Sequence, residues 1–225
     1  MTQKMMKDFK VNVLWDKENI IEIPKDQVYQ AQNLKISADA SSATPFFCLT
    51  AINSGSISVE GLDLNCKQPD LAIIKILETM GAKVISTGKV VHLTSRALNA
   101  ISIDMINMTD IVPCLAMTAL FAKGKSKLNN IQHIQYKESN RIDSICKLLK
   151  LVGARFELQT NSLHIEGGTA KAGAILPSFN DHRIAMAGSL LGSKLKGTEI
   201  INPDCVSKTY PNYFNDFLKL LNNHF

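Results

Sequence analysis

The polar residues best suited to chemistry in this chain recur at a fixed interval. Lys137 and Lys208 are 71 residues apart, and the same interval separates three aspartates, Asp39, Asp110 and Asp181. Each of the two lysines follows the aspartate of its own repeat by 27 residues. A fixed interval of this length indicates one supersecondary unit used three times. Equivalent polar residues are therefore expected at equivalent places in the fold.

Two short motifs contain most of the charged candidates. They are KESNRI, at residues 137–142, and NDHR, at residues 180–183, and each is expected to open a helix. Arginine can bind a carboxylate or phosphate at two points, lysine adds a point charge, and helix N-termini offer unpaired N–H groups. The pattern predicts a site for a small anion. The cations expected to hold the anion are Lys137, Arg141, Arg183 and Lys208.

Three further residues at these loops, Asp110, Glu138 and His182, are candidates for proton transfer. Each of these residues, like each of the cations, also has an ordinary structural explanation. An aspartate that opens a helix is typically a cap, and a glutamate near a helix start is favoured by the helix dipole. His182 alone would be an ordinary loop histidine, and a lone surface cation commonly forms a weak ion pair. The functional interpretation rests on their coincidence at equivalent loops of successive units.

The elements that must position these residues can be predicted from periodicity and from helix and turn signals. In each unit we expect a buried helix, a strand, an amphipathic helix and a hairpin. For the first unit these lie at residues 41–53, 57–59, 70–80 and 83–94. For the second they lie at residues 111–122, 127–131, 139–152 and 155–166. The third has only the first three, at residues 183–194, 199–201 and 212–221.

With the short strand-like run that ends at each aspartate, every unit reads β-α-β-α-β-β. The predicted fold class is α/β (α+β): one pseudo-threefold lobe with the apolar helices inside and the sheets outside. We expect residues 36–225 to form this lobe, with units at about 36–100, 101–171 and 172–225. Residues 1–35, with predicted strands at 10–15 and 19–23, are expected to be the tail hairpin of a preceding unit plus a linker. The natural protein is therefore expected to extend upstream.

Composition narrows the class of protein. The net charge of +5 is modest and the lysines are spread out, which does not favour a nucleic-acid partner. The five cysteines are odd in number and lack CxxC spacing, which argues against a disulfide framework and against a metal site. The N-terminus has no apolar signal core, and the most apolar stretch, 111–122, is shorter than the roughly 20 residues that span a bilayer. A soluble cytoplasmic protein is predicted.

Several motifs give the chain a family resemblance. They are DASSAT at 39–44, KESNRI at 137–142, NDHRIAMA at 180–187 and SKTYPNYF at 207–214. At these motifs the sequence resembles the enolpyruvyl transferases, and most closely the 5-enolpyruvylshikimate-3-phosphate (EPSP) synthase, or 3-phosphoshikimate 1-carboxyvinyltransferase, family. The resemblance covers essentially the whole chain but only the C-terminal half of the family. The family's fold of two lobes, each of three units, implies a missing N-terminal lobe as partner, because its KS-x-S-x-R and GNAGT motifs do not occur here.

The resemblance implies a reaction of aromatic amino acid biosynthesis. The 5-hydroxyl of shikimate 3-phosphate would add to C2 of phosphoenolpyruvate, C3 would be protonated, and phosphate would then leave, with no metal or cofactor. By the family's motifs, Asp110 would be the base near the shikimate hydroxyl, Glu138 the acid at C3, and Lys137 a contact on the shikimate side. His133 stands where the family commonly has an asparagine that contacts shikimate. The residues implied to lie around phosphoenolpyruvate are Arg141, Arg183 and Lys208, with His182 beside them.

Two further departures from the family pattern lie in the same region. Asn140 stands where an aspartate is usual, and Gln135 where an arginine is frequent. With half of the expected site missing, the chain is predicted to have negligible activity alone. Two other interpretations remain open: half of a UDP-N-acetylglucosamine enolpyruvyl transferase, or a non-catalytic subunit or binding module that uses this lobe.

Overall fold

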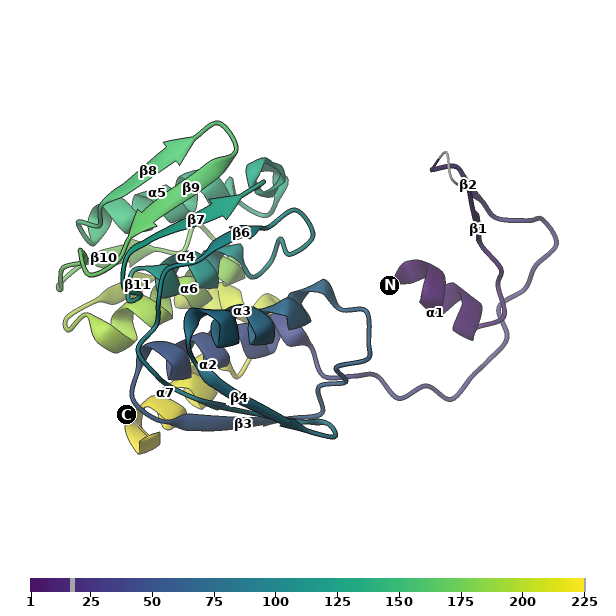
Figure 1. The fold of residues 1–225 in the computed structure, drawn as a ribbon. Helices are drawn as coiled ribbons and strands as arrows, with labels where there is room; N and C mark the ends of the chain where they lie inside the picture. The colour runs from purple at the N-terminus through teal and green to yellow at the C-terminus, as the bar shows by residue number, and fades with distance from the viewer. Residues whose placement is uncertain (17–18, 225) are drawn as a thin grey trace.

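Three buried helices form the centre of the molecule. The computed structural model describes residues 1–16 and 19–224, and Figure 1 shows its fold. The central helices, which pack against one another in pairs, are α2 (Ala40–Ile52), α4 (Val112–Ala119) and α6 (His182–Lys194). Every residue of α4 is buried, as are the first ten residues of α6. A helix buried all round belongs to the core, so the prediction of apolar helices inside is confirmed.

Three small sheets surround these helices. The first has the strand order β3-β5-β4, with β3 (Ser56–Glu60), β4 (Lys83–Thr87) and β5 (Val90–Thr94) antiparallel. The second has the order β6-β7-β9-β8 and comprises β6 (Ser102–Asp104), β7 (Lys125–Asn129), β8 (Phe156–Gln159) and β9 (Ser162–Glu166). The third pairs β10 (Ile175–Pro177) with β11 (Glu199–Ile201) in parallel. The sheets alternate with helices along the chain, as the fold class predicts.

A second helix follows the strand after each buried helix, and a 3₁₀ turn leads into it. The helices are α3 (Ala72–Met80), α5 (Arg141–Leu151) and α7 (Tyr213–His224). The turns are η1 (Pro69–Leu71), η2 (Gln132–Tyr136) and η3 (Pro203–Lys208). The predicted helix at 70–80 is therefore a 3₁₀ turn followed by a shorter α-helix. The predicted helix at 111–122 is also shorter, because the N–H groups of residues 120–122 bond three residues back rather than four.

One predicted strand is absent. β6 and β10 precede the second and third buried helices, each parallel to the next strand of its unit, but the described chain has no strand directly before α2. The Ala38 N–H donates to the Gly61 carbonyl at 3.1 Å, while Leu34 and Ile36 are exposed. In Figure 1 the residues before α2 run away from the body as an extended segment. The free side of β3 is therefore not covered by a strand of its own unit.

The N-terminal residues lie to one side of the body (Figure 1). A short helix, α1 (Thr2–Asp8), precedes an antiparallel pair, β1 (Leu14–Trp15) and β2 (Ile21–Glu22). The pair agrees with the predicted strands at 10–15 and 19–23 in a shorter form, and residues 17–18 lie outside the described residues. Trp15 is 57% exposed and Ile21 56%, so this segment buries few of its apolar side chains.

Gly167, which follows β9 of the second sheet, is required by a close backbone contact. A Cβ built on Gly167 would lie 1.7 Å from the Ala122 carbonyl oxygen, so no other residue fits there. The Gly167 N–H donates to the Gly124 carbonyl at 2.9 Å, which ties the end of β9 to the start of β7. The Gly167-Gly168 pair is thus a packing turn.

Three further observations concern the expected class of protein. No helix in the described part of the chain has the length and apolar character needed to cross a membrane. Within those same residues, no group of three or more His, Cys, Asp or Glu could hold a metal ion. All five cysteines, each of which the structure describes, are free thiols.

Candidate functional site

The starts of α4, α5 and α6 meet at one side chain, Arg141. Its guanidinium is 1% exposed and donates from Nε to Asp181 Oδ2 at 2.9 Å. Nη1 donates to Asp110 Oδ1 at 2.9 Å, and Nη2 donates to Glu138 Oε2 at 2.8 Å. Charge-assisted bonds of this kind are stronger than neutral ones. Arg141 therefore fixes three carboxylates from three loops in one cluster.

Two lysines extend this cluster outward. Lys137 Nζ lies 3.2 Å from Asp110 Oδ1, and Lys208 Nζ donates to Glu138 Oε1 at 2.8 Å. The Lys208 side chain is 58% exposed and that of Glu138 30%. Because both lysines are on the rim, their ends can exchange a carboxylate partner for an incoming anion. The structure thus brings together the two lysines that the 71-residue interval makes equivalent.

The cations control the charge of the acidic residues. Burial raises the pKa of Asp110, but the Arg141 and Lys137 charges outweigh burial and bring that pKa to about 2. Burial also raises the pKa of Glu138, and hydrogen bonding from Lys208 with the Arg141 charge lowers it below its usual range. Both carboxyl groups are therefore ionised at neutral pH in this arrangement.

The three repeated aspartates do not play the same role. The Asp39 carboxylate accepts from the Ser41 and Ser42 N–H groups, and Asp181 Oδ1 accepts from the Arg183 N–H at 2.9 Å, so both cap the helices that they open. α4 has no such cap, because its N-cap residue is Ile111. Asp110 instead directs its carboxylate to Arg141 and Lys137. In the second unit the aspartate therefore belongs to the polar cluster and does not cap its helix.

Arg183 and His182 carry buried polar atoms without partners. Arg183 is 6% exposed, and its Nε and Nη1 have no hydrogen-bond partner among the described residues. Nδ1 of His182, a residue 3% exposed, is likewise unpartnered there, and Asp181 Oδ1 is 4.0 Å away. Burial and the neighbouring Arg183 charge lower the pKa of His182, so its ring is neutral at pH 7. A buried cation whose donors lack partners is costly, which makes Arg183 a candidate for anion binding.

The turn before these two residues has an unusual backbone. Phe179 and Asn180 both have φ of 55°, in the left-handed region. Asparagine tolerates this region, but phenylalanine seldom adopts it. The Asn202 side-chain amide donates to Asn180 Oδ1 at 3.3 Å and helps to hold the turn. Strained backbone of this kind concentrates at functional sites, and here it sets the position of Asp181 and His182.

The last predicted site residue, His133, lies on η2 in the loop that leads to Lys137. Its ring is partly buried, and its Nε2 has no partner among the described residues. The predicted residues are thus at the starts of α4, α5 and α6 and in the turns η2 and η3.

Comparison with known proteins identifies the family. A family profile described as EPSP synthase (3-phosphoshikimate 1-carboxyvinyltransferase) matches residues 1–217. The chain belongs to the EPSP synthase family. It is 35% identical over 222 residues to the 3-phosphoshikimate 1-carboxyvinyltransferase of Nostoc punctiforme, across 98% of this chain and 52% of that protein. It is 36% identical over 220 residues to the 3-phosphoshikimate 1-carboxyvinyltransferase of Buchnera aphidicola subsp. Acyrthosiphon pisum, across 97% of this chain and 52% of that protein.

Solved structures give the same extent of match. An EPSP synthase from Acinetobacter baumannii superposes with a TM-score of 0.83 at 25% identity, over 97% of this chain and 53% of that one. The enolpyruvyl transferase NikO from Streptomyces tendae superposes with a TM-score of 0.75 at 16% identity, over 99% of this chain and 52% of that one. At this level of identity the likeness shows the fold alone. The chain spans about half the length of the curated relatives it matches.

Sequence reasoning did not single out one buried acidic residue of the first unit, Asp70. It lies in η1, is 7% exposed, and accepts a hydrogen bond from the Ser41 hydroxyl. Burial raises its pKa, in contrast to Asp110. A signal was present in the numbering, because Asp70 precedes Arg141 by the same 71 residues that relate the other site residues.

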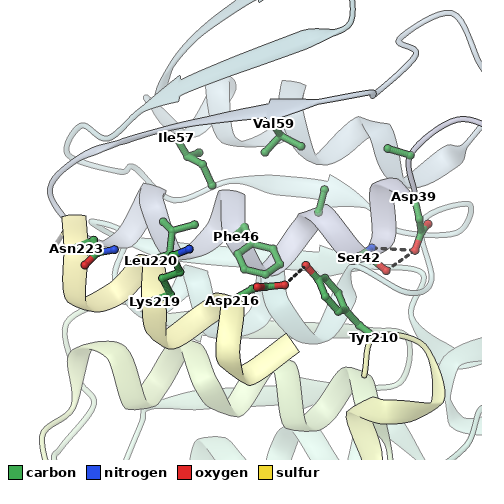
Figure 2. A pocket seen from close by; sticks show the side chains of 12 residues that line it. Asp39, Ser42, Phe46, Ile57, Val59, Tyr210, Asp216, Lys219, Leu220 and Asn223 are labelled. Carbon is green, nitrogen blue, oxygen red and sulfur yellow. Dashed lines mark hydrogen bonds between the residues drawn. The ribbon is translucent and has the colours of Figure 1, made fainter. Parts of the chain in front are cut away.

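An apolar groove of about 500 Å³ lies beside this region, between α2, β3 and α7 (Figure 2). Phe46, Ile57 and Leu220 line it, and Tyr210 donates a hydrogen bond to Asp216 at its edge. The groove is next to the free side of β3, where no strand of the first unit lies. Because the cations of the family motifs do not line it, the groove is distinct from the charged cluster.

Proposed function

We propose that this chain supplies the phosphoenolpyruvate-binding half of a 3-phosphoshikimate 1-carboxyvinyltransferase. Residues 36–225 would form one lobe, and residues 1–35 would join a complementary lobe that supplies the other half of the site. The complete enzyme would transfer the enolpyruvyl group to the 5-hydroxyl of shikimate 3-phosphate and release phosphate. Free thiols on all five cysteines fit a reducing cytoplasmic setting.

The observation that carries the proposal is the buried, unpartnered guanidinium of Arg183 beside the Arg141 cluster. Phosphoenolpyruvate is a compact anion with a carboxylate and a phosphate. Arg183 offers it unused Nε and Nη1 donors, and Lys208 offers an exposed charge at the rim. Such preorganised donors stabilise charge without reorganisation during the reaction.

Anion binding would also prepare the two carboxyl groups for proton transfer. Lys208 helps to hold the pKa of Glu138 down, and Lys137 adds to the larger effect of Arg141 on the pKa of Asp110. When substrate phosphates or carboxylates draw the lysines away, both pKa values rise. Glu138 can then take up a proton and pass it to C3, while Asp110 becomes a stronger base for the proton of the 5-hydroxyl. The hydroxyl oxygen bonds to C2, and return of a C3 proton to Glu138 expels phosphate and regenerates the double bond.

Arg141 would act mainly by holding the acid and the base in place. Its guanidinium is 1% exposed and already bonds to Asp110, Glu138 and Asp181. Direct contact of Arg141 with phosphoenolpyruvate, which the resemblance implies, stays a prediction. His182, neutral and adjacent, would provide a hydrogen bond rather than a charge. His133 would face the shikimate side.

The test is phosphate release from phosphoenolpyruvate and shikimate 3-phosphate. The chain alone is expected to give negligible turnover, because closure of two lobes is needed to exclude water and complete the site. Adding the N-terminal half of the Nostoc punctiforme relative is expected to restore turnover. The same mixture prepared with the Glu138→Gln variant of this chain is expected to show no turnover. Turnover by the chain alone would contradict the two-lobe requirement. No turnover in any mixture, with no binding of either substrate, would favour a non-catalytic module.

The family match supports the shikimate substrate over UDP-N-acetylglucosamine. A competition experiment in the reconstituted mixture separates the two. Phosphate release is expected with shikimate 3-phosphate and not with UDP-N-acetylglucosamine, and the opposite preference would overturn the proposed substrate.

A further inference from the structure

The three units differ in the strand that precedes the buried helix. In the second and third units this strand, β6 or β10, pairs in parallel with the strand that follows the buried helix. Among the described residues of the first unit, no strand pairs with β3 on the side away from β5. An open sheet edge presents unpaired N–H and C=O groups, which favours the addition of another strand.

The 71-residue interval identifies the residues of the first unit that correspond to β6 and β10. Leu34, Met105 and Leu176 follow one another at this interval. Met105, directly after β6, and Leu176, in β10, are fully buried, whereas Leu34 is 42% exposed. Ile36, on the same segment, is 87% exposed. The segment around Leu34 therefore lacks the packing that its two counterparts have.

The same interval gives a register for pairing this segment with β3. In the second unit, the Met105 N–H donates to the Asn129 carbonyl at 2.9 Å, at the end of the β6–β7 pair. The residues 71 positions earlier are Leu34 and Ser58, and Ser58 lies in the middle of β3. The equivalent bond in the first unit would join the Leu34 N–H to the Ser58 carbonyl.

The backbone of β3 is oriented for this bond. The Gly55 carbonyl accepts from the Ser95 N–H at 2.9 Å, and the Gly61 N–H donates to the Lys89 carbonyl at 2.9 Å, both toward the β4–β5 hairpin. Ser58 is three residues from each glycine (58 − 55 = 3; 61 − 58 = 3). Because backbone groups alternate sides along a strand, those of Ser58 face the free side of β3.

The apolar groove lies where the side chains of such a strand would pack. The second helix of the second unit, α5, packs against β10, the first strand of the third unit. The pseudo-threefold equivalent is α7 against the segment before α2. The groove between β3 and α7 occupies this place, and Phe46, Ile57, Val59 and Leu220 line it (Figure 2). Its lining matches an aliphatic side chain at position 34.

One end of the segment is already fixed beside β3. The Ala38 N–H donates to the Gly61 carbonyl at 3.1 Å. The Gln68 side chain donates to the Ala38 carbonyl at 2.9 Å and accepts from the Ala40 N–H at 2.8 Å. The residues before Ala38 instead run away from the body (Figure 1). They can therefore change direction at Ala38 without disturbing the start of α2.

We propose that residues 33–37 are a strap that closes onto β3 as a parallel strand and places Leu34 in the groove between α2, β3 and α7. Burial of apolar side chains and pairing of the open edge both favour closure. Closure fixes the place where residues 1–32 leave the lobe. The inference concerns the fold of the first unit and does not depend on the substrate of the proposed function.

Hydrogen exchange of the full chain, followed by NMR, tests the strap. In the unsubstituted chain the Leu34 N–H is expected to exchange at least about tenfold more slowly than in an unstructured peptide. Leu34→Asp is expected to lose this protection, because a carboxylate does not enter an apolar groove without cost. Lys35→Ala is the matched control and should keep it, since neighbouring residues of a strand face opposite sides. Slow exchange of the Leu128 N–H, in β7, shows that each variant is folded.

An unprotected Leu34 N–H in the folded, unsubstituted chain would overturn the proposal, as would equal protection in Leu34→Asp. A second measurement needs no variant. Nuclear Overhauser contacts are expected between the Leu34 methyl groups and the Phe46 ring, and their absence would contradict closure. Protection that disappears on dilution, together with a dimer, would show that a second copy covers β3 and would also overturn the strap.

Discussion

Arg141 and Asp181 form a buried ion pair with two contacts. Nε donates to Oδ2 at 2.9 Å and Nη2 to Oδ1 at 3.3 Å, and Asp181 has no exposed surface. The same Asp181 carboxylate caps α6 and accepts from the Ser139 hydroxyl at 3.0 Å. One carboxylate thus joins the starts of α5 and α6, so the site and the fold depend on the same bonds.

Arg141→Met is therefore expected to cost about 3–5 kcal/mol of folding free energy, because it leaves a buried carboxylate unpaired. Urea unfolding at pH 7 measures this cost. Arg155→Met is the matched control, since Arg155 pairs with Glu166 at the surface and is 71% exposed. The control should change stability by less than about 1 kcal/mol. Equal effects of the two substitutions would show that the Arg141 cluster does not support the fold.

Acid should weaken the fold through the same carboxylates. Asp110 has a folded-state pKa of about 2, and the pKa of Asp181 is also lowered, since its bonds from Arg141 outweigh the effect of burial. Their stabilisation is complete above the unfolded pKa of about 4 and is lost as the pH falls through the folded pKa. The urea midpoint is expected to drop between about pH 5 and pH 2, and less so in Asp110→Asn. Asp70 has the opposite sign, since its raised pKa makes its charged form destabilising at neutral pH.

His182 should titrate below the ordinary histidine value. Burial and the adjacent Arg183 charge lower its pKa. Its neutral form is favoured in the folded state, so the resulting stability is present above pH 6.5 and declines as the pH falls below that value. Histidine ring NMR of the folded chain is expected to place the midpoint under about 6.5, with a return to that value in urea. A folded midpoint above 6.5 would show that the ring is charged at this position.

Lys208→Ala should change the charge of Glu138 with little effect on folding. Lys208 is 58% exposed, so loss of its ion pair should cost less than about 1 kcal/mol. The pKa of Glu138 is expected to rise, because its hydrogen bond from Lys208 is the largest influence that lowers it. A ¹³C titration of the Glu138 carboxyl measures the change, with Lys75→Ala as control, since Lys75 pairs with Glu78 elsewhere. A Glu138 midpoint that stays unchanged would contradict the proposed coupling.

Local signals predicted the buried helices and the hairpins, because these depend on residues close in sequence. The repeat interval also predicted that Lys137 and Lys208 occupy equivalent loops. The partners of Arg141 could not be predicted in this way, since Asp110 lies 31 residues away and Asp181 lies 40. Which aspartate caps its helix and which serves the cluster depends on those distant contacts. Whether a strand forms before α2 likewise depends on pairing with the more distant β3, and this could not be predicted from local signals.

The central claim is that this chain carries an anion site of the EPSP synthase type, centred on Arg183. The most direct test is isothermal calorimetry with phosphoenolpyruvate and shikimate 3-phosphate, separately and together, at low salt. Weak phosphoenolpyruvate binding is expected, with loss in Arg183→Ala and in Lys208→Ala but not in Lys75→Ala. Binding that is unaffected by Arg183→Ala and Lys208→Ala, or absent even when a complementary N-terminal lobe is present, would contradict the claim.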